Sequence, residues 1–144
     1  MSSDVPRRMI LDLTSFNNVI GQLEQGVAEA RAHVGNHLMR DGVIQRFKYT
    51  YELGHKMLRR FMEATEVRSD VIDAMSLPDL IRAASGRGLL LRGWDQWAEY
   101  RKARDSASHA YGGNEAAEVF SVIPAFLDDV RHLRDQIAKG PRQG

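Results

Sequence analysis

The sequence predicts an all-α protein, built as an up-down bundle of about five helices around one core. Apolar residues recur at spacings of three and four along nearly the whole chain, as they do on one face of an amphipathic helix. No stretch sustains the alternation of apolar and polar residues that marks a half-buried strand. The chain also lacks a hairpin turn between β-branched runs, because Asp41 and Gly42 are flanked by helical patterns.

The first two helices are expected to be long and to pack as an antiparallel pair. Apolar positions step by three and four from 13 to 34, and the same pattern recurs from 44 to 61. Gly35, Asn36 and Gly42 are helix breakers. We therefore expect the connection between the two helices to lie somewhere in 35–42.

A short third helix is expected after the segment 66–75, which is too short and too mixed in character for a long helix. Ser76 is a favourable N-cap, and Pro78 is tolerated in the first turn of a helix. Gly86 and Gly88 are expected to end this helix, because glycine breaks helical patterns.

Two further helices complete the predicted bundle. The fourth begins near Trp94 or the residue after it and continues to the glycine pair at 112–113, which is a C-terminal stop signal. Asn114 is expected to cap the fifth helix, and Gly140 to end it. Pro124 lies inside this last helix and should kink it.

Length and composition indicate one domain. The 144 residues suit a single helical domain over 10–140, with flexible ends at 1–9 and 141–144. The absence of Cys excludes disulfide frameworks, thiolate metal sites and cysteine nucleophiles, and favours a cytoplasmic location. No run approaches the roughly 18 apolar residues of a membrane span, and the N-terminal stretch is not of the secretory type. We therefore expect a soluble protein with no membrane contact.

Opposite charges nearly cancel over the whole chain. Twenty Lys and Arg residues stand against 19 Asp and Glu residues, a formal net charge of +1. The domain as a whole therefore has no basic footprint for a nucleic acid, and any such binding must depend on local charge. The stretch 81–104 is locally cationic, since its basic residues outnumber Asp95 and Glu99: Arg82, Arg87, Arg92, Arg101, Lys102 and Arg104.

The common enzyme motifs are absent. The sequence has no Gly-rich phosphate loop, no His-Glu-x-x-His, no Gly-x-Ser-x-Gly and no calcium loop. His33 and His37 have a spacing that can hold zinc, but helix breakers lie between them and no carboxylate is obvious nearby, so we expect an ordinary surface turn. His55 and His132 fall on charged helix faces and are expected to be solvated.

A rarer pattern occurs close to a helix end. Arg104 and His109 are five residues apart, and Tyr111 follows two residues later. Chance predicts about 0.5 occurrences of the Arg–His spacing, but only roughly 0.02 once the Tyr is required. On a straight helix Arg104 and His109 point about 140° apart. A joint site therefore needs either a helix that unwinds before Gly112 or a second protomer related by a two-fold axis.

Three segments together are typical of one family. They are Ile44-Gln45-Arg46-Phe47 with Tyr51-Glu52-Leu53, then Trp97 with Tyr100-Arg101, and finally the Arg-x4-His-x-Tyr pattern from Arg104 to Tyr111. On these segments the chain resembles the HEPN superfamily of small helical proteins over about residues 13–137. The group it resembles is that of HEPN toxins paired with a minimal nucleotidyltransferase antitoxin, formerly described as nucleotidyltransferase substrate-binding proteins.

The resemblance implies the toxin of a type II-like or type VII toxin–antitoxin pair. Such a toxin is an endoribonuclease that uses no metal or other cofactor, and its site forms across a homodimer. By position, Arg104 and His109 are the implied catalytic pair. Tyr111 is the residue to which the cognate nucleotidyltransferase, with its own ATP and Mg²⁺, adds AMP to silence the toxin. Many relatives have Asn directly after this Arg, whereas this sequence has Asp105.

The residue types suit metal-free cleavage of RNA. The reaction needs the 2′-hydroxyl deprotonated, the leaving 5′-oxygen protonated and the extra charge on phosphorus stabilised. Imidazole titrates near neutral pH and serves as acid or base, and the arginine fork suits the phosphorane-like charge. Asp105 and Ser108 are the expected supporting residues, which hold the imidazole of His109 or the guanidinium of Arg104 in place.

Structural interpretations of the same residues stay open. Arg104 can pair with Asp105 or Glu99 on the surface, Tyr111 can pack under the following loop, and His109 can cap its helix. Two other functions also remain. One is a non-catalytic subunit that binds substrate or nucleotide for a separately encoded nucleotidyltransferase, and the other is a purely structural helical dimer.

The two tryptophans have a structural expectation as well. Trp94 and Trp97 are expected in the core or at a dimer interface, with base stacking as the minority alternative.

Overall fold

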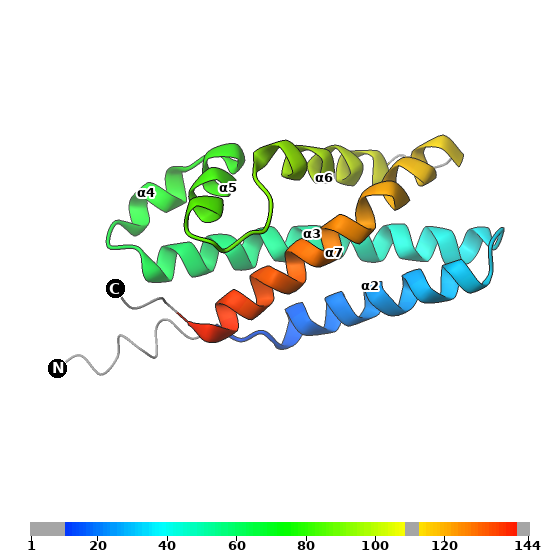
Figure 1. Cartoon of the computed structure of the whole chain (residues 1–144), viewed down its shortest axis with the longest axis horizontal. Helices are drawn as coiled ribbons and strands as arrows, with labels where there is room; N and C mark the ends of the chain where they lie inside the picture. The colour runs from blue at the N-terminus through cyan, green and yellow to red at the C-terminus, as the bar shows by residue number, and fades with distance from the viewer. Residues whose placement is uncertain (1–10, 109–112, 141–144) are drawn as a thin grey trace.

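The computed structural model describes residues 11–108 and 113–140 of the chain, and over these residues it contains α-helices and no strand. The helices are α2 (Thr14–Ala32), α3 (His37–Thr65), α4 (Ser69–Ala74), α5 (Leu77–Gly86), α6 (Trp94–Ala107) and α7 (Gly113–Lys139), as Figure 1 shows. The all-α prediction is confirmed. The described residues form six helices, so the expected number of about five is corrected. The ends expected to be flexible, 1–9 and 141–144, lie outside the described residues.

The additional helix is α4, in the segment 66–75. Its six residues bury one apolar side chain, Ile72, which is 3% exposed. Arg59 on α3 donates hydrogen bonds from its guanidinium to the carbonyl oxygens of Ile72 at 2.8 Å and Met75 at 3.3 Å. A helix of less than two turns leaves too short an apolar pattern for sequence periodicity to reveal. Contacts with α3 therefore hold this turn in place.

The helices α2 and α3 lie side by side as the expected antiparallel hairpin (Figure 1). The side chain of Asn36 caps α3 by accepting a hydrogen bond from the Met39 N–H at 3.1 Å. Because α3 begins at His37, the connection is confined to 33–36 and Gly42 lies inside the helix. The two helices approach closely at Gly26, where an added Cβ would lie 3.2 Å from Cγ2 of Val43.

The boundaries of α5 agree with the sequence prediction, and those of α6 and α7 agree in part. Ser76 caps α5 by accepting from the Asp79 N–H at 3.3 Å. The helix α6 begins at Trp94 but ends at Ala107, before the glycine pair expected to end it. The helix α7 begins at Gly113, one residue before the expected cap Asn114, and continues through Pro124. The kink expected at Pro124 stays a prediction.

An aromatic cluster joins α3, α6 and α7 at the centre of the core. The rings of Phe47, Tyr51, Trp97, Tyr100 and Phe126 contact one another with centroid separations from 4.9 to 6.5 Å. Trp97 is 2% exposed, which confirms a core position, and Trp94 is partly buried against the same core. Edge and tilted aromatic contacts of this kind add to the hydrophobic stabilisation. They fix the axis of α6, which carries the candidate site.

A buried carboxylate ties the segment after α5 to α6 and α7. Asp129 on α7 is fully buried and accepts hydrogen bonds from the hydroxyl of Tyr100 at 2.7 Å and the Leu91 N–H at 3.0 Å. It also pairs with the Arg92 guanidinium at 3.3 Å. Burial of Tyr100 and its hydrogen bond to this carboxylate raise the pKa of the phenol. The donors compensate for the cost of burying the carboxylate.

None of the helices in the described part of the chain combines the length and the apolar character that crossing a membrane requires.

Candidate functional site

The helix α6 carries part of the predicted site. Arg104 and Asp105 lie in its last turn, and Ser108 is the residue that ends it. His109 and Tyr111, the other two predicted site residues, lie outside the described residues. The regular helix therefore stops between Arg104 and His109 in the sequence. Their joint participation in one site stays a prediction.

The guanidinium of Arg104 is held by two carboxylates. Nη2 donates to Oε2 of Glu52 on α3 at 2.8 Å, and Nη1 donates to Oδ1 of Asp105 at 3.3 Å. The hydrogen bond to Glu52 is the largest of the effects that raise the pKa of Arg104. The side chain is 36% exposed. Arg104 is thus a cation held by two carboxylates, with part of its side chain exposed to solvent.

One nitrogen of this side chain has no partner in the described part of the chain. Nε of Arg104 is buried and makes no hydrogen bond to any atom of the described residues. An unpaired buried donor is costly, and native proteins contain few of them. Nε1 of Trp97, on the same helix, is likewise buried without a partner among the described residues. A catalytic role is one of the explanations for such a donor, so the observation is compatible with a functional Arg104 but does not single it out.

The two supporting residues differ in what they contact. Asp105 pairs with Arg104, as one of the sequence interpretations expected, although its own side chain is 63% exposed. Ser108 is exposed, and its backbone N–H donates to the Asp105 carbonyl at 3.2 Å. Its hydroxyl makes no hydrogen bond within 11–108 or 113–140. The supporting role of Ser108 stays a prediction.

The helix α3 contributes neighbours of Arg104 that local sequence patterns did not identify as site residues. Besides Glu52, the ring of Tyr51 lies nearby, and burial raises its pKa to about 12, an effect that the charges of Arg101 and Arg104 partly oppose. Glu52 had been noted only as part of the family pattern. Its contact with Arg104 joins residues 52 positions apart, which no short-range spacing can reveal.

Two histidines expected to be solvated are instead partly buried. Burial is the main effect that lowers the pKa of His55 on α3, and the positive charges of Arg59 and Arg101 lower it further. The Arg59 guanidinium lies 3.5 Å from its Nε2. His132 on α7 lies with its Nε2 2.9 Å from the Gly88 carbonyl oxygen. The prediction failed because charged neighbours in sequence do not determine which side chains a second helix covers.

Most cations of the stretch 81–104 are paired in the folded chain. Arg82 pairs with Asp79 at 3.3 Å, Arg87 with Glu66 at 2.8 Å, and Arg92 with Asp129. The acids that pair with these arginines lie outside the stretch 81–104 in the sequence. The local excess of positive charge in the sequence therefore does not produce a basic surface along this stretch. Arg101 and Lys102 are exposed, and neither forms an ion pair within the described part of the chain.

These two cations line an open depression between α6 and the start of α7. Its other lining residues are Ala98, Asp105, Ser106 and Glu115. Ser106 also donates to Glu118 on α7 at 3.1 Å, which links the two helices beside the depression. Both signs of charge are therefore present here. A phosphate group can approach Arg101 and Lys102, but Asp105 and Glu115 limit how strongly it is attracted.

A metal pair at His33 and His37 is not supported. His33 follows the end of α2 and directs Nδ1 to the Glu29 carbonyl oxygen at 3.0 Å, whereas His37 is the first residue of α3. Among the described residues no three or more His, Asp or Glu side chains are placed to hold a metal ion. The arrangement is the surface turn that the sequence predicted.

Three comparisons with known proteins agree on the family. Residues 11–139 match the family model described as nucleotidyltransferase substrate binding protein like. A curated relative from Haemophilus influenzae, named probable ribonuclease HepT, is 33% identical over 96 residues, which are 67% of this chain and 65% of that protein. The alignment thus spans about two thirds of either length.

A solved structure from the same species shares the fold. It is described as revealing the fold of a substrate binding domain of a nucleotidyltransferase, and it is similar to this chain with a TM-score of 0.81 at 27% identity. The match covers 88% of this chain and 99% of that one. The helical architecture is therefore common to both proteins.

Proposed function

Because the chain belongs to the nucleotidyltransferase substrate binding protein like family, we propose that it acts as an endoribonuclease toxin of the HEPN type. The relative named as a probable ribonuclease supports this activity. The observation that carries the proposal is the state of Arg104, a cation fixed by Glu52 and Asp105 whose side chain is still 36% exposed. A preorganised arginine fork suits the charge that develops on a phosphate during its transfer.

In the proposed reaction a base removes the proton of the ribose 2′-hydroxyl, and the 2′-oxygen attacks the adjacent phosphorus. The bond from phosphorus to the 5′-oxygen breaks, and an acid protonates that oxygen. The products are a 2′,3′-cyclic phosphate and a 5′-hydroxyl. His109 is the proposed acid or base, and in a homodimer two copies of it share these roles. Arg104 stabilises the additional negative charge on the phosphate oxygens.

Glu52 is the proposed positioning residue for Arg104. Its hydrogen bond of 2.8 Å fixes Nη2, while the longer contact of 3.3 Å from Nη1 to Asp105 is the weaker of the two. A phosphate is able to displace Asp105 from Nη1 and leave the Glu52 contact in place. Asp105 therefore competes with the substrate phosphate for the Nη1 donor of Arg104. An uncharged residue at this position would compete less strongly.

Regulation is proposed to act at Tyr111. A cognate minimal nucleotidyltransferase, with ATP and Mg²⁺, would transfer AMP to the phenol oxygen, which attacks the α-phosphate and releases pyrophosphate. The resulting phosphodiester adds a negative charge and bulk close in sequence to Arg104 and His109. Both effects oppose RNA binding. The partner enzyme and its ATP are therefore the proposed antitoxin system.

Cleavage of a labelled single-stranded RNA by the purified chain tests the nuclease. We expect cleavage in the presence of EDTA, and a loss of about 100-fold or more in rate for His109→Ala and for Arg104→Ala, since each removes a group acting on the transition state. Arg60→Gln is the matched control, because Arg60 is an exposed residue at the far end of α3. Equal rates for His109→Ala and the wild type would contradict the assignment.

A mass measurement tests the modification. Incubation with a cognate minimal nucleotidyltransferase and ATP should add the mass of AMP to the wild-type chain and none to Tyr111→Phe. Addition that survives in Tyr111→Phe would place the modification elsewhere.

A second function is favoured by the structural neighbour described as a substrate binding domain of a nucleotidyltransferase. In that case the chain presents substrate to a separate nucleotidyltransferase and cleaves no RNA. The two functions differ in one respect: a binding subunit raises the turnover of its partner enzyme, and His109→Ala leaves that effect unchanged.

A further inference from the structure

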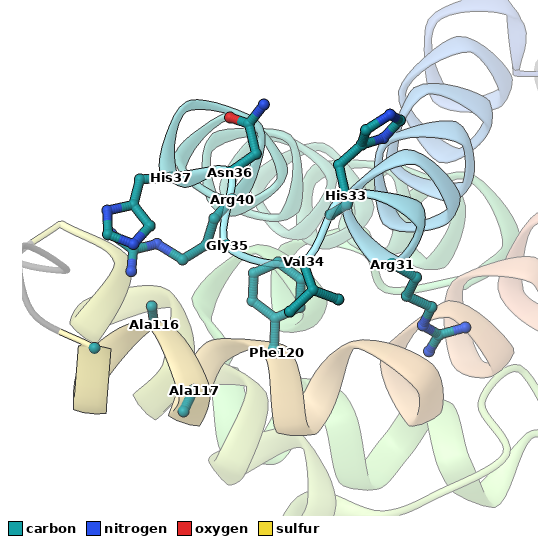
Figure 2. Close-up of a pocket in the computed structure, with 12 residues that line it drawn as sticks. Arg31, His33, Val34, Gly35, Asn36, His37, Arg40, Ala116, Ala117 and Phe120 are labelled. Atoms are coloured by element: carbon teal, nitrogen blue, oxygen red, sulfur yellow. The ribbon is translucent and has the colours of Figure 1, made fainter.

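A second cavity lies at the tip of the α2–α3 hairpin, against the first turns of α7 (Figure 2). Its volume is about 380 Å³, which falls within the range of pockets that hold small ligands. Lining residues come from 30–37 and Arg40 on the hairpin and from Gly113 to Phe120 on α7. The hairpin tip that lines it lies at the end of the bundle where α6 ends and α7 begins (Figure 1).

Apolar side chains make up much of the lining of this hairpin-tip cavity. Ala30 and Val34 line it from the hairpin, and Ala117 and Phe120 line it from α7. Figure 2 shows the Phe120 ring directed from α7 toward Val34. Val34 is 90% exposed, so no described residue covers it. An aromatic ring beside uncovered aliphatic surface is a favourable contact for the face of a nucleobase.

Positive charge flanks this apolar lining on both sides. Arg31 stands at one side, and Arg40 and His37 stand at the other (Figure 2). No Asp or Glu is among the described residues that line the cavity. Arg40 is partly neutralised by Asp41 at 3.2 Å, whereas Arg31 forms no ion pair with any of the described residues. Two helix N-termini, those of α3 and α7, also contribute lining residues and favour an anion.

We propose that the hairpin-tip cavity binds one nucleotide of the RNA substrate, with the base on Phe120 and Val34 and the phosphate at Arg31. The inference rests on the proposed nuclease function and names a substrate-binding subsite for it. A nucleotide combines a flat apolar face with a negative charge a few ångströms away, which matches this lining. Gly113, which lines the cavity, follows His109 by only four residues in the sequence, so the subsite and the predicted catalytic residue are close along the chain.

The test measures binding without cleavage. The probe is a fluorescent single-stranded oligonucleotide with 2′-O-methyl riboses, which lacks the hydroxyl that the reaction uses. Ala117→Glu places an acid in the cavity from an exposed position of α7, and Arg31→Gln removes a cation. We expect each change to raise the Kd about five- to tenfold, and Arg31→Gln to reduce the slope of log K against log salt by about 0.7.

Two matched variants control for charge and folding. Ala138→Glu is the control for Ala117→Glu, because it places the same acid at an exposed position near the other end of α7. Arg60→Gln is the control for Arg31→Gln, because it removes an exposed arginine near the end of α3 that lies away from the cavity. Both should bind the oligonucleotide as the wild type does. Unchanged binding in Ala117→Glu and Arg31→Gln, or no binding by the wild type, would overturn the inference.

Two further measurements separate this inference from its alternatives. Cleavage of unmodified RNA is assayed with the same preparations. If the chain binds the oligonucleotide as expected but does not cleave RNA, the result supports the binding subsite and contradicts the proposed nuclease activity. Free AMP is titrated in parallel. Binding of AMP, sensitive to Ala117→Glu, without binding of the oligonucleotide would identify a free-nucleotide site and overturn the assignment to RNA.

Discussion

Arg104 illustrates how one side chain acquires its properties from residues far away in the sequence. Glu52 lies on another helix, yet it accepts the shorter of the two hydrogen bonds that orient the guanidinium. With a side chain 36% exposed, this ion pair contributes only about 0–1 kcal/mol to stability. The main effect of this ion pair is therefore to orient the guanidinium of Arg104 rather than to stabilise the fold.

His55 gives a prediction about pH at the same scale. Burial, together with Arg59 and Arg101, lowers its pKa below the ordinary value of 6.5. As the pH falls, His55 is protonated in the unfolded chain before it is protonated in the folded chain. The contribution of His55 to stability is therefore fully present above about pH 6.5 and is lost as the pH falls below that value. In His55→Gln the decrease in melting temperature from about pH 7.5 to pH 5.5 should be smaller than in the wild type.

Thermal unfolding at the two pH values checks this expectation. His37→Gln is the matched control, because it replaces an exposed histidine of the same helix. An equal acid-induced decrease in His55→Gln and the wild type would mean that protonation of His55 does not oppose folding.

Among the elements, α6 is placed by its contacts with neighbouring helices. Its own sequence is polar and buries only Trp97, Tyr100, Ala103 and Ala107. The aromatic contacts with α3 and α7 and the hydrogen bond from Tyr100 to Asp129 determine where it lies. An element with so few buried side chains is positioned by packing rather than by helix propensity. Its position in turn sets that of Arg104.

Replacement of Asp129 tests this dependence. Asp129→Ala removes a fully buried acceptor and leaves the Tyr100 hydroxyl and the Leu91 N–H without their partner. The free energy of unfolding should fall by about 3 kcal/mol or more. Asp128→Ala, at the neighbouring and 53% exposed position, should change it by less than about 1 kcal/mol. Urea denaturation measures both, and similar losses in the two variants would contradict the role of the buried network.

Over the whole molecule, charge is distributed by pairing rather than by segregation. The net charge is +1, and four arginines of the stretch 81–104 are paired with acids that lie outside it. Arg31, Arg101 and Lys102, which form no ion pair with the described residues, line the two depressions near the end of the bundle. RNA binding by such a surface should be local and strongly weakened by salt.

Oligomeric state is the prediction that belongs to this scale. A site that uses Arg104 and His109 from a two-fold pair of chains requires a homodimer at the concentration of the activity assay. Light scattering at micromolar concentration should therefore give twice the mass of the 16.3 kDa chain. A monomer that retains full activity would contradict the shared site.

Local patterns in the sequence were sufficient for most of the fold. The apolar spacing predicted α2 and α3, and the cap at Ser76 predicted where α5 begins, because these signals act within one or two helical turns. The family followed from short motifs in the same way. The short helix α4 was missed, since its formation depends on contacts with α3 rather than on its own pattern.

By itself, then, the sequence determined the helical class, the family and the identity of the candidate catalytic residues, all of which depend on residue type and short-range spacing. Only the tertiary structure decided that Glu52 holds Arg104, that His55 is partly buried, and that Asp129 joins three segments. It also brought the hairpin tip against α7 to form a cavity. These features join residues tens of positions apart, and which helix faces meet is a property of packing that no local pattern encodes.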